Sequence, residues 1–460
     1  MRKLATALVV SALLAAGPAL AQAKSGKGGG YEQLNLFGEA YDRIRQDAVE
    51  PVGEGKLIGA AIAGMLSGLD TRSAYINEAA YRAMQAPANE DQASLGLVVT
   101  IENGQLKVIA PQDGSPAAQA GIQPGDLIYA IDKDPTYDLT LGEAEQKLRG
   151  PVGSEVELSL RRGNRGPIKL TVKRERYKLQ TVTARLHSGN IGYLRVAGFD
   201  AGTAAALAGA VQDLRQRAGN KVIGFILDLR NNPGGLDLRN NPGGLDLRNN
   251  PGGGFEAAVA VADAFIDKGD IVVVKGRKPA SLKRISATPG DIAQGVPIVA
   301  LINGGTAREA ELVAGGLQDN RRAVLLGTKS FGESSIESLI PLPGNGAIRL
   351  TTARFMTPSG QRIQGKGLNP DLTVMPVKLA KLPQGERRRE ADLRGALKNT
   401  DPVRTTGKDS DAKAVGASST SASGSPPSLA TADIGSADDE QLSEAADVLR
   451  GLSLVSGRAG

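Results

Sequence analysis

The segment Val222-Ile-Gly-Phe-Ile-Leu-Asp-Leu-Arg-Asn-Asn-Pro-Gly-Gly235 joins an apolar run to a glycine-rich turn. A short continuous apolar run that ends at turn residues predicts a strand buried on both faces. Glycine after the run allows the backbone to turn sharply and to approach another group closely. A helix is expected to begin at Phe255. Strand, turn and helix in this order indicate an α/β domain.

The nine residues Leu-Asp-Leu-Arg-Asn-Asn-Pro-Gly-Gly occur three times without interruption, at Leu227–Gly235, Leu236–Gly244 and Leu245–Gly253. Only one copy can occupy the end of the strand. The first copy continues the strand and the third leads into the helix. The turn is therefore either assembled from both ends with the middle looped out, or the extra copies form an inert surface loop. The single Asp of each copy is accompanied by an Arg, which opposes a cation, so we do not expect the repeat to bind calcium. We also predict no metal site and no cofactor.

Strands and helices alternate over residues 185–376, which predicts a sheet covered by helices. The expected strands are Ile191–Val196, Val222–Leu229, Ile271–Val274, Ile298–Ile302, Ala323–Leu326 and Ala347–Thr352, and the expected helices are Ala204–Arg217, Phe255–Phe265 and Glu309–Leu317.

Residues 94–178 instead hold short β-branched runs separated by turns. The segments Ser115-Pro-Ala-Ala-Gln-Ala-Gly121 and Pro124-Gly-Asp-Leu-Ile-Tyr-Ala-Ile131, with a helix expected over Leu139–Arg149, resemble a PDZ domain of the bacterial protease type. The resemblance implies that a peptide adds as a strand to an open sheet edge, where backbone N–H groups capture its terminal carboxylate. Alternatively, the glycine of the capturing loop only permits a turn. That loop would consist of Ser94, Leu95, Gly96 and Leu97; the expected strands are Leu97–Ile101, Leu106–Ile109, Leu127–Ile131, Val156–Leu160 and Ile168–Val172.

The ends of the chain differ from its centre. Residues 1–21 have two basic residues, an apolar run and Ala19-Leu-Ala21, as in a secretory signal peptide, so we expect export, for instance to a periplasm. An uncleaved signal would instead anchor the chain in the membrane; after cleavage we expect no stable membrane span. Residues 31–90 predict a helical region of two amphipathic helices. Residues 378–460 predict a low-complexity, disordered tail, with a short helix over Asp439–Leu452 of unknown role.

The composition of the chain argues against one class of partner, nucleic acids. Aromatic residues make up 3% of the chain, Trp is absent and the net charge is +6, so nucleic-acid binding is not expected. The chain has no cysteine, so its stability comes from packing rather than disulfides.

Across most of its length the chain resembles the carboxyl-terminal processing proteases of peptidase family S41. The segments that carry this resemblance are Tyr31-Glu-Gln-Leu-Asn-Leu-Phe-Gly-Glu39, the PDZ segment, the repeated motif, Val313-Ala-Gly-Gly-Leu-Gln-Asp319, Leu350-Thr-Thr-Ala-Arg-Phe-Met-Thr-Pro-Ser-Gly360 and Ile363-Gln-Gly-Lys-Gly-Leu-Asn-Pro-Asp371. The resemblance implies a multidomain α/β protein with a PDZ domain and a serine peptidase core.

The resemblance also locates the catalytic positions. In the family, Ser-Ala-Ser-Ala-Ser-Glu supplies the nucleophile at its middle serine, and Phe-Gly-Lys-Gly supplies a lysine base. This chain has Thr306-Ala-Arg-Glu-Ala-Glu311 and Phe331-Gly-Glu-Ser334 at the family's own spacing. Arg308 therefore stands at the serine position, Glu333 at the lysine position and Glu337 at the position of the glutamine that orients the lysine. Candidates for the turn that would bind the oxyanion are Gly235, Gly253 and Glu309.

These substitutions remove the expected chemistry. Arginine has no hydroxyl and stays protonated, so Arg308 cannot form an acyl-enzyme. We expect it to pair with Glu333 or Glu337 instead. The residues weighed as surrogate nucleophiles or bases are Thr306, Ser330, Ser334, Ser335 and Lys329, and the single histidine, His187, is expected to be structural.

The sequence thus favours an exported pseudoprotease that recognises the C-terminal segments of exported proteins, with an active S41 relative as a second candidate partner. Two alternatives stay open: an active endopeptidase that uses displaced residues, and a non-catalytic envelope scaffold.

Overall fold

The computed structural model describes part of the chain, which divides into two compact units, Met1–Gly68 and Leu69–Gly460. The proposed signal peptide, the second and third motif copies, Gly235 and most of the predicted tail lie outside the described residues. The described residues are 29–85, 92–137, 139–163, 166–177, 179–234, 254–376, 434–436 and 438–455.

The first unit contains the two predicted helices, α1 (Gly29–Asp47) and α2 (Glu54–Ser67). An ion pair of 2.7 Å joins Arg45 to Glu54 across the connecting segment. Many apolar side chains of these helices are exposed, including Tyr31 and Leu34. Among the described residues, no helix has the length and apolar character needed to cross a bilayer.

The PDZ domain is built on a sheet in the order β3-β4-β5-β8-β9, in which β3 is an edge strand. All five expected strands are present, and so is the expected helix, which lies between the third and the fourth of them. The core is aliphatic and includes Leu95, Val108, Ile128 and Leu158. The elements are β2 (Gln92–Ala93), β3 (Leu97–Glu102), β4 (Gln105–Pro111), α4 (Pro116–Gln119), β5 (Leu127–Ile131), β6 (Asp134–Pro135), α5 (Leu141–Leu148), β7 (Gly150–Pro151), β8 (Glu155–Arg161) and β9 (Pro167–Lys173).

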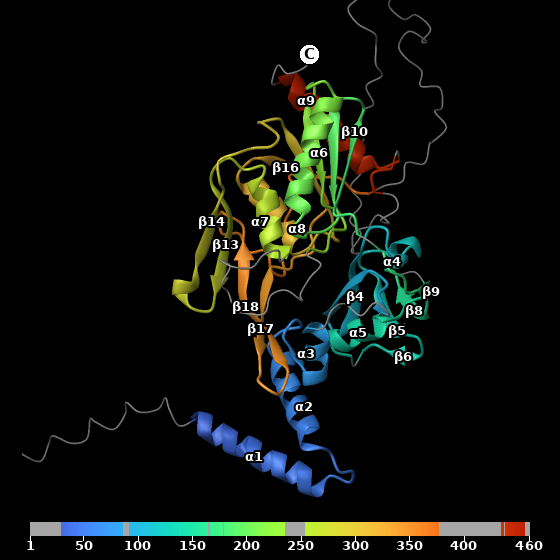
Figure 1. The fold of residues 1–460 in the computed structure, drawn as a ribbon, viewed down its shortest axis with the longest axis vertical. Coiled ribbons are helices and arrows are strands. Elements are labelled where there is room, and N and C mark those ends of the chain that lie inside the picture. The colour runs from blue at the N-terminus through green and yellow to red at the C-terminus, as the bar shows by residue number, and fades with distance from the viewer. Residues whose placement is uncertain are drawn as a thin grey trace, which may run out of the picture. The chain divides into compact units, whose positions relative to one another are not determined.

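The second domain is built around a sheet in the order β10-β11-β12-β15-β16-β19, parallel except for the β10–β11 pair. Its side chains alternate between two cores: Phe225 and Leu227 face one, and Ile226 faces the other. Helices α6, α7 and α8 cover the first face (Figure 1). The elements are β10 (Val182–His187), β11 (Ile191–Val196), α6 (Thr203–Arg217), β12 (Gly224–Asp228), α7 (Gly254–Asp263), β15 (Ile298–Ile302), α8 (Glu309–Asp319), β16 (Ala323–Gly327) and β19 (Leu372–Thr373).

A second sheet of the same unit has the order β1-β18-β13-β14, with β17 also paired to β18. The sequence predicted β13 and β18 but not β1, β14 or β17. The pairing of β1 with β18 brings residues just after the first unit against the peptidase-like core. The elements are β1 (Ala74–Ile76), α3 (Glu78–Gln85), β13 (Asp270–Gly276), η1 (Pro279–Ser281), β14 (Lys283–Ser286), β17 (Ser335–Pro341) and β18 (Ala347–Met356).

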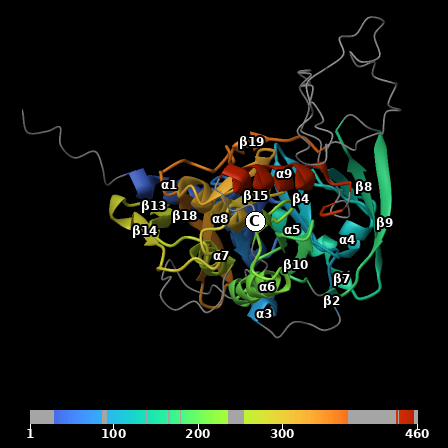
Figure 2. The ribbon, with the colours of Figure 1, turned by 90° about the horizontal axis from the view of Figure 1, so that it is seen from above.

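The C-terminal helix α9 (Glu440–Val455) covers the second face of the parallel sheet, opposite α6 and α7 (Figure 2). Leu442, Ala445, Ala446 and Leu449 are buried there with Ile226 and other sheet residues. A Cβ at Gly224 would meet the Leu449 side chain at 2.6 Å, so glycine at 224 makes room for it. The helix was predicted, but its place is in the domain core rather than on a tail.

Candidate functional site

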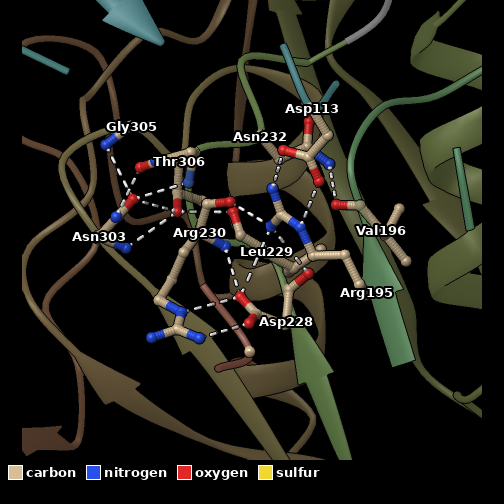
Figure 3. Close-up of polar contacts among 12 residues, drawn as sticks. Asp113, Arg195, Val196, Asp228, Leu229, Arg230, Asn232, Asn303, Gly305 and Thr306 are labelled. Atoms are coloured by element: carbon tan, nitrogen blue, oxygen red, sulfur yellow. Dashed lines mark hydrogen bonds and ion pairs between the residues drawn. The ribbon is translucent and has the colours of Figure 1, made fainter. Parts of the chain in front are cut away.

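The first copy of the repeated motif begins within β12, and its described residues, 227–234, lie inside the protein. Arg230, Asn231 and Asn232 have no exposed surface. The Asn231 side chain meets Asn303 in the loop that follows the neighbouring strand β15, whereas the Asn232 side chain donates to the carbonyl oxygen of Val196 (Figure 3). The other two copies lie outside the described residues, so the inert surface loop expected for the extra copies stays a prediction.

Arg230 is the best-paired charge of the turn. Its guanidinium lies between two carboxylates, with Nη2 at 2.5 Å from Asp228 Oδ2 and 2.6 Å from Asp439 Oδ2. Its Nε donates to Asp228 Oδ1, and Nη1 donates to Asp439 Oδ1 and Gln441 Oε1. Burial alone would lower the pKa of Arg230, but the two carboxylates outweigh it and raise the pKa. Because Asp439 precedes α9, this pairing joins the C-terminal helix to the turn.

Amide side chains join the ends of β12 and β15. Asn231 N–H donates to Asn303 Oδ1 at 2.9 Å, and Asn303 Nδ2 donates back to Asn231 Oδ1 at 2.8 Å. The Thr306 hydroxyl donates to the carbonyl oxygen of Leu229 at 2.9 Å. Ala307 N–H donates to the carbonyl oxygen of Asn232 at 3.0 Å. The turn and the loop that leads to Arg308 therefore form one hydrogen-bonded unit.

Arg308 has an unusual backbone conformation, with φ 51° and ψ −115° immediately before α8. A non-glycine residue in such a region is strained by roughly 1–3 kcal/mol, and this kind of strain is typical of active sites. A sharp turn into a helix is also how nucleophile-bearing residues are presented in hydrolases. The backbone therefore keeps the form of a nucleophile site, although the side chain is arginine.

The Arg308 side chain is nearly buried and loosely paired. Its Nη2 lies 3.5 Å from Glu337 Oε2, and its Nε lies 3.7 Å from Glu309 Oε2. Among the described residues, Nε has no hydrogen-bond acceptor. Burial opposes the charge, but Glu309 and Glu337 outweigh it and raise the pKa of Arg308. The predicted pairing with Glu337 is confirmed, and the geometry is poor.

Glu333 pairs with a different residue, which the sequence did not reveal. Arg72 Nη2 lies 2.5 Å from the Glu333 carboxylate, and both side chains are buried. Burial alone would raise the pKa of Glu333, but Arg72 and then Arg308 outweigh it and lower the pKa. Nearby, burial with the charges of Arg72 and Arg308 lowers the pKa of Arg349. Arg72 could not be found from sequence, because only the pairing of β1 with β18 brings it here.

Glu311 holds the two catalytic-position segments together. Its carboxylate accepts from the N–H groups of Arg308, Gly332 and Glu333 at 2.8–3.1 Å, and from the Ser330 hydroxyl at 2.5 Å. Burial raises the pKa of Glu311 to about 8, against the effect of these donors. The geometry around positions 308 and 333 thus rests on a residue other than those two side chains.

Two of the five surrogate groups are engaged elsewhere. The hydroxyl of Thr306 bonds to Leu229, and that of Ser330 bonds to Glu311. The Ser334 hydroxyl is buried, and Lys329 is exposed. The Ser335 hydroxyl donates to Glu337 Oε1 at 2.6 Å. Ser330 and Ser335 thus each have a carboxylate at hydrogen-bonding distance, but the Glu311 carboxylate beside Ser330 also accepts from three backbone N–H groups.

An ion pair joins the PDZ domain to Arg195 of β11, beside the turn. Asp113 accepts from Arg195 Nε at 2.9 Å and Nη2 at 2.8 Å, and Arg195 also donates to the carbonyl oxygens of Asp228 and Arg230 (Figure 3).

In the predicted capture loop, which begins at Ser94 and runs into β3 at Leu97, the carbonyl oxygens of Leu95 and Gly96 accept from the N–H groups of Ala117 and Gln112. Gly96 has φ +71°, and a Cβ there would overlap Ser115. Glycine is thus required at position 96 by packing as well as by conformation.

The family model of Peptidase family S41 matches residues 190–238 and 245–374, and a PDZ domain model matches residues 107–162. A carboxy-terminal-processing protease of Bartonella bacilliformis is 41% identical over 346 residues, which cover 75% of each chain. The chain belongs to the S41 carboxyl-terminal processing protease family.

Other relatives agree with this assignment. The carboxy-terminal processing protease CtpA of Bacillus subtilis is 30% identical over 77% of this chain and 72% of its own. Among solved structures, the photosystem II D1 C-terminal processing protease superposes with a TM-score of 0.62 at 27% identity, over 75% of this chain and 93% of that one. The S41 match is interrupted between residues 238 and 245, inside the repeated motif. The gap lies within the second copy, Leu236–Gly244, whereas the first and third copies are matched.

Proposed function

We propose that this S41 family member is a pseudoprotease that recognises protein C-termini through its PDZ domain. The observation that carries the proposal is the pairing at the catalytic positions. Arg308, on a strained nucleophile-type backbone, faces Glu337, and Glu333 at the lysine position is bound to Arg72. An acyl-enzyme needs a hydroxyl or thiol with a base beside it. Neither position supplies one.

Recognition is supported by the free edge of the PDZ sheet. Strand β3 pairs with β4 on one side only in the described sheet, and helix α5 packs near it. Such an edge accepts a peptide strand by main-chain hydrogen bonds. The clients we propose are C-terminal segments of exported proteins, since residues 1–21 read as a signal peptide. An active S41 relative is the second candidate partner.

The test uses purified mature protein and a labelled peptide that ends in an apolar residue with a free carboxylate. We expect micromolar binding by fluorescence anisotropy and no cleavage product by mass spectrometry. The same peptide with a C-terminal amide is the matched control, and its binding should be at least about 10-fold weaker, since a charged hydrogen-bond acceptor is lost. Equal binding of the two peptides would exclude terminal-carboxylate capture and favour the envelope scaffold.

A second candidate function is proteolysis by displaced residues. The hydrogen bond from Ser335 to Glu337 is the observation that favours it. Cleavage by the native protein that is abolished in Ser335→Ala and retained in Ser334→Ala would establish this alternative and refute the pseudoprotease.

A further inference from the structure

The side chain of Glu309 lies against the glycine turn. Gly234 has φ +102°, and a Cβ there would overlap Oε2 of Glu309 and come within 3.0 Å of the Arg308 Cβ. Glu309 is 8% exposed, so its carboxylate is held between the turn and the helix start rather than in solvent. Glycine at 234 is the residue that leaves room for this carboxylate.

A helix N-terminus and a guanidinium group lie beside that carboxylate. Glu309 is the first residue of α8, where the N–H groups of an eleven-residue helix begin and its dipole is positive. The Arg308 guanidinium Nε lies 3.7 Å from Glu309 Oε2. From α7, Glu256 faces the same region: burial, and then the charge of Glu309, raise the pKa of Glu256. The arginine and the helix N-terminus attract the carboxylate of Glu309, whereas the charge of Glu309 disfavours a second carboxylate at Glu256.

This position is also where acyl transfer would place its negative charge. In hydrolases with a nucleophile on a strained turn, the N–H of the following residue helps to bind the oxyanion. Residue 309 follows the strained residue 308, and the glycine turn lies opposite. We propose that the Glu309 carboxylate is a built-in anion that fills this oxyanion position, so the site is closed independently of positions 308, 333 and 337.

The inference rests on the proposed function, because it explains why restoring the catalytic residues would not restore activity. Family segments have alanine at position 309, which places no anion there. The triple variant Arg308→Ser, Glu333→Lys, Glu337→Gln is therefore expected to stay inactive, and adding Glu309→Ala should raise its cleavage rate at least about 100-fold, the effect of a functioning oxyanion site. Equal rates for the triple and quadruple variants, if both cleave, would overturn the inference.

A binding experiment decides the question without catalysis. In Glu309→Ala the vacated position should accept a small carboxylate, so sodium acetate should raise the melting temperature by about 3 °C over sodium chloride at equal ionic strength when acetate is about 10-fold above its dissociation constant. The native protein and Glu309→Gln should show no such difference, since the position remains filled. Glu256→Ala is the matched control, because it removes a neighbouring partly buried carboxyl group and leaves Glu309 in place.

The two proposals fail in different ways. Cleavage by the native protein would refute the pseudoprotease. Acetate that fails to stabilise Glu309→Ala would refute the built-in anion. So would acetate that stabilises Glu256→Ala and the native protein as much as it stabilises Glu309→Ala. This second result decides the inference even if no revertant cleaves the peptide.

Discussion

A buried arginine, Arg230, and a nearly buried one, Arg308, lie beyond the ends of the neighbouring parallel strands β12 and β15, and they are held differently. Arg230 lies between two carboxylates with contacts of 2.5–3.0 Å and has no exposed side-chain surface. Arg308 has contacts of 3.5 and 3.7 Å and keeps 12% of its side-chain surface exposed. A buried charge is stabilised only when good geometry satisfies its donors. The protein therefore has one position built for an arginine and one position built for another residue.

The largest expected effect comes from the well-paired arginine. Asp439→Asn should lower the free energy of unfolding by about 4 kcal/mol, because it leaves the fully buried Arg230 without one of its two charges. Asp438→Asn is the matched control, since Asp438 is exposed and adjacent. Urea denaturation of both variants measures the difference. Equal, small losses would show that Arg230 is no better held than Arg308.

The carboxyl group of Glu311 holds the backbone around Arg308 in place. Glu311 has a pKa of about 8 in the folded protein against 4.5 as the ordinary value. A carboxyl group with a raised pKa contributes stability below about pH 4.5, and this contribution is lost as pH rises to about 8. The native free energy of unfolding should therefore fall from pH 5 to pH 8 by about 3 kcal/mol more than that of Glu311→Gln. Parallel pH profiles for the two proteins would contradict this.

The double substitution Arg308→Met with Glu337→Gln compares the two arginines directly. It should change the free energy of unfolding by less than about 1.5 kcal/mol, since a poorly paired buried ion pair adds little over apolar packing. The pair Arg230→Met with Asp439→Asn should lose several times more. Thermal unfolding under identical conditions tests both, and similar losses would mean that contact distance does not separate the two sites.

The sequence predicted the elements more fully than their partners. Continuous apolar runs and helical spacing located β11, β15 and α8 because burial determines those patterns. Strands β10 and β17 have mixed burial, so no pattern marked them. The pairing of Arg308 with Glu337 followed from aligned motifs. The pairing of Arg72 with Glu333 did not, because residues far apart in sequence meet only through the β1–β18 register.

The C-terminal helix shows the same limit. Its apolar spacing predicted a helix, but the low-complexity sequence before it suggested a tail. Nothing local in Leu449 or Asp439 indicates that Gly224 and Arg230 are their partners. Position within the fold is a property of pairs of residues, and a single sequence shows only one member at a time.

The smallest expected effect tests how α9 is attached. Arg450 donates to the Ser188 hydroxyl at 3.0 Å and pairs with Asp447, but these contacts are exposed and solvent competes for them. Arg450→Ala should therefore lower the free energy of unfolding by less than about 0.5 kcal/mol. Leu449→Ala, one residue earlier on the same helix, should lower it by about 3 kcal/mol because its side chain fills the space above Gly224. Urea denaturation measures both losses. A larger loss for Arg450→Ala would mean that the exposed contacts of α9 attach the helix to the domain. The Arg230–Asp439 pair would then be a consequence of helix docking rather than a cause of it.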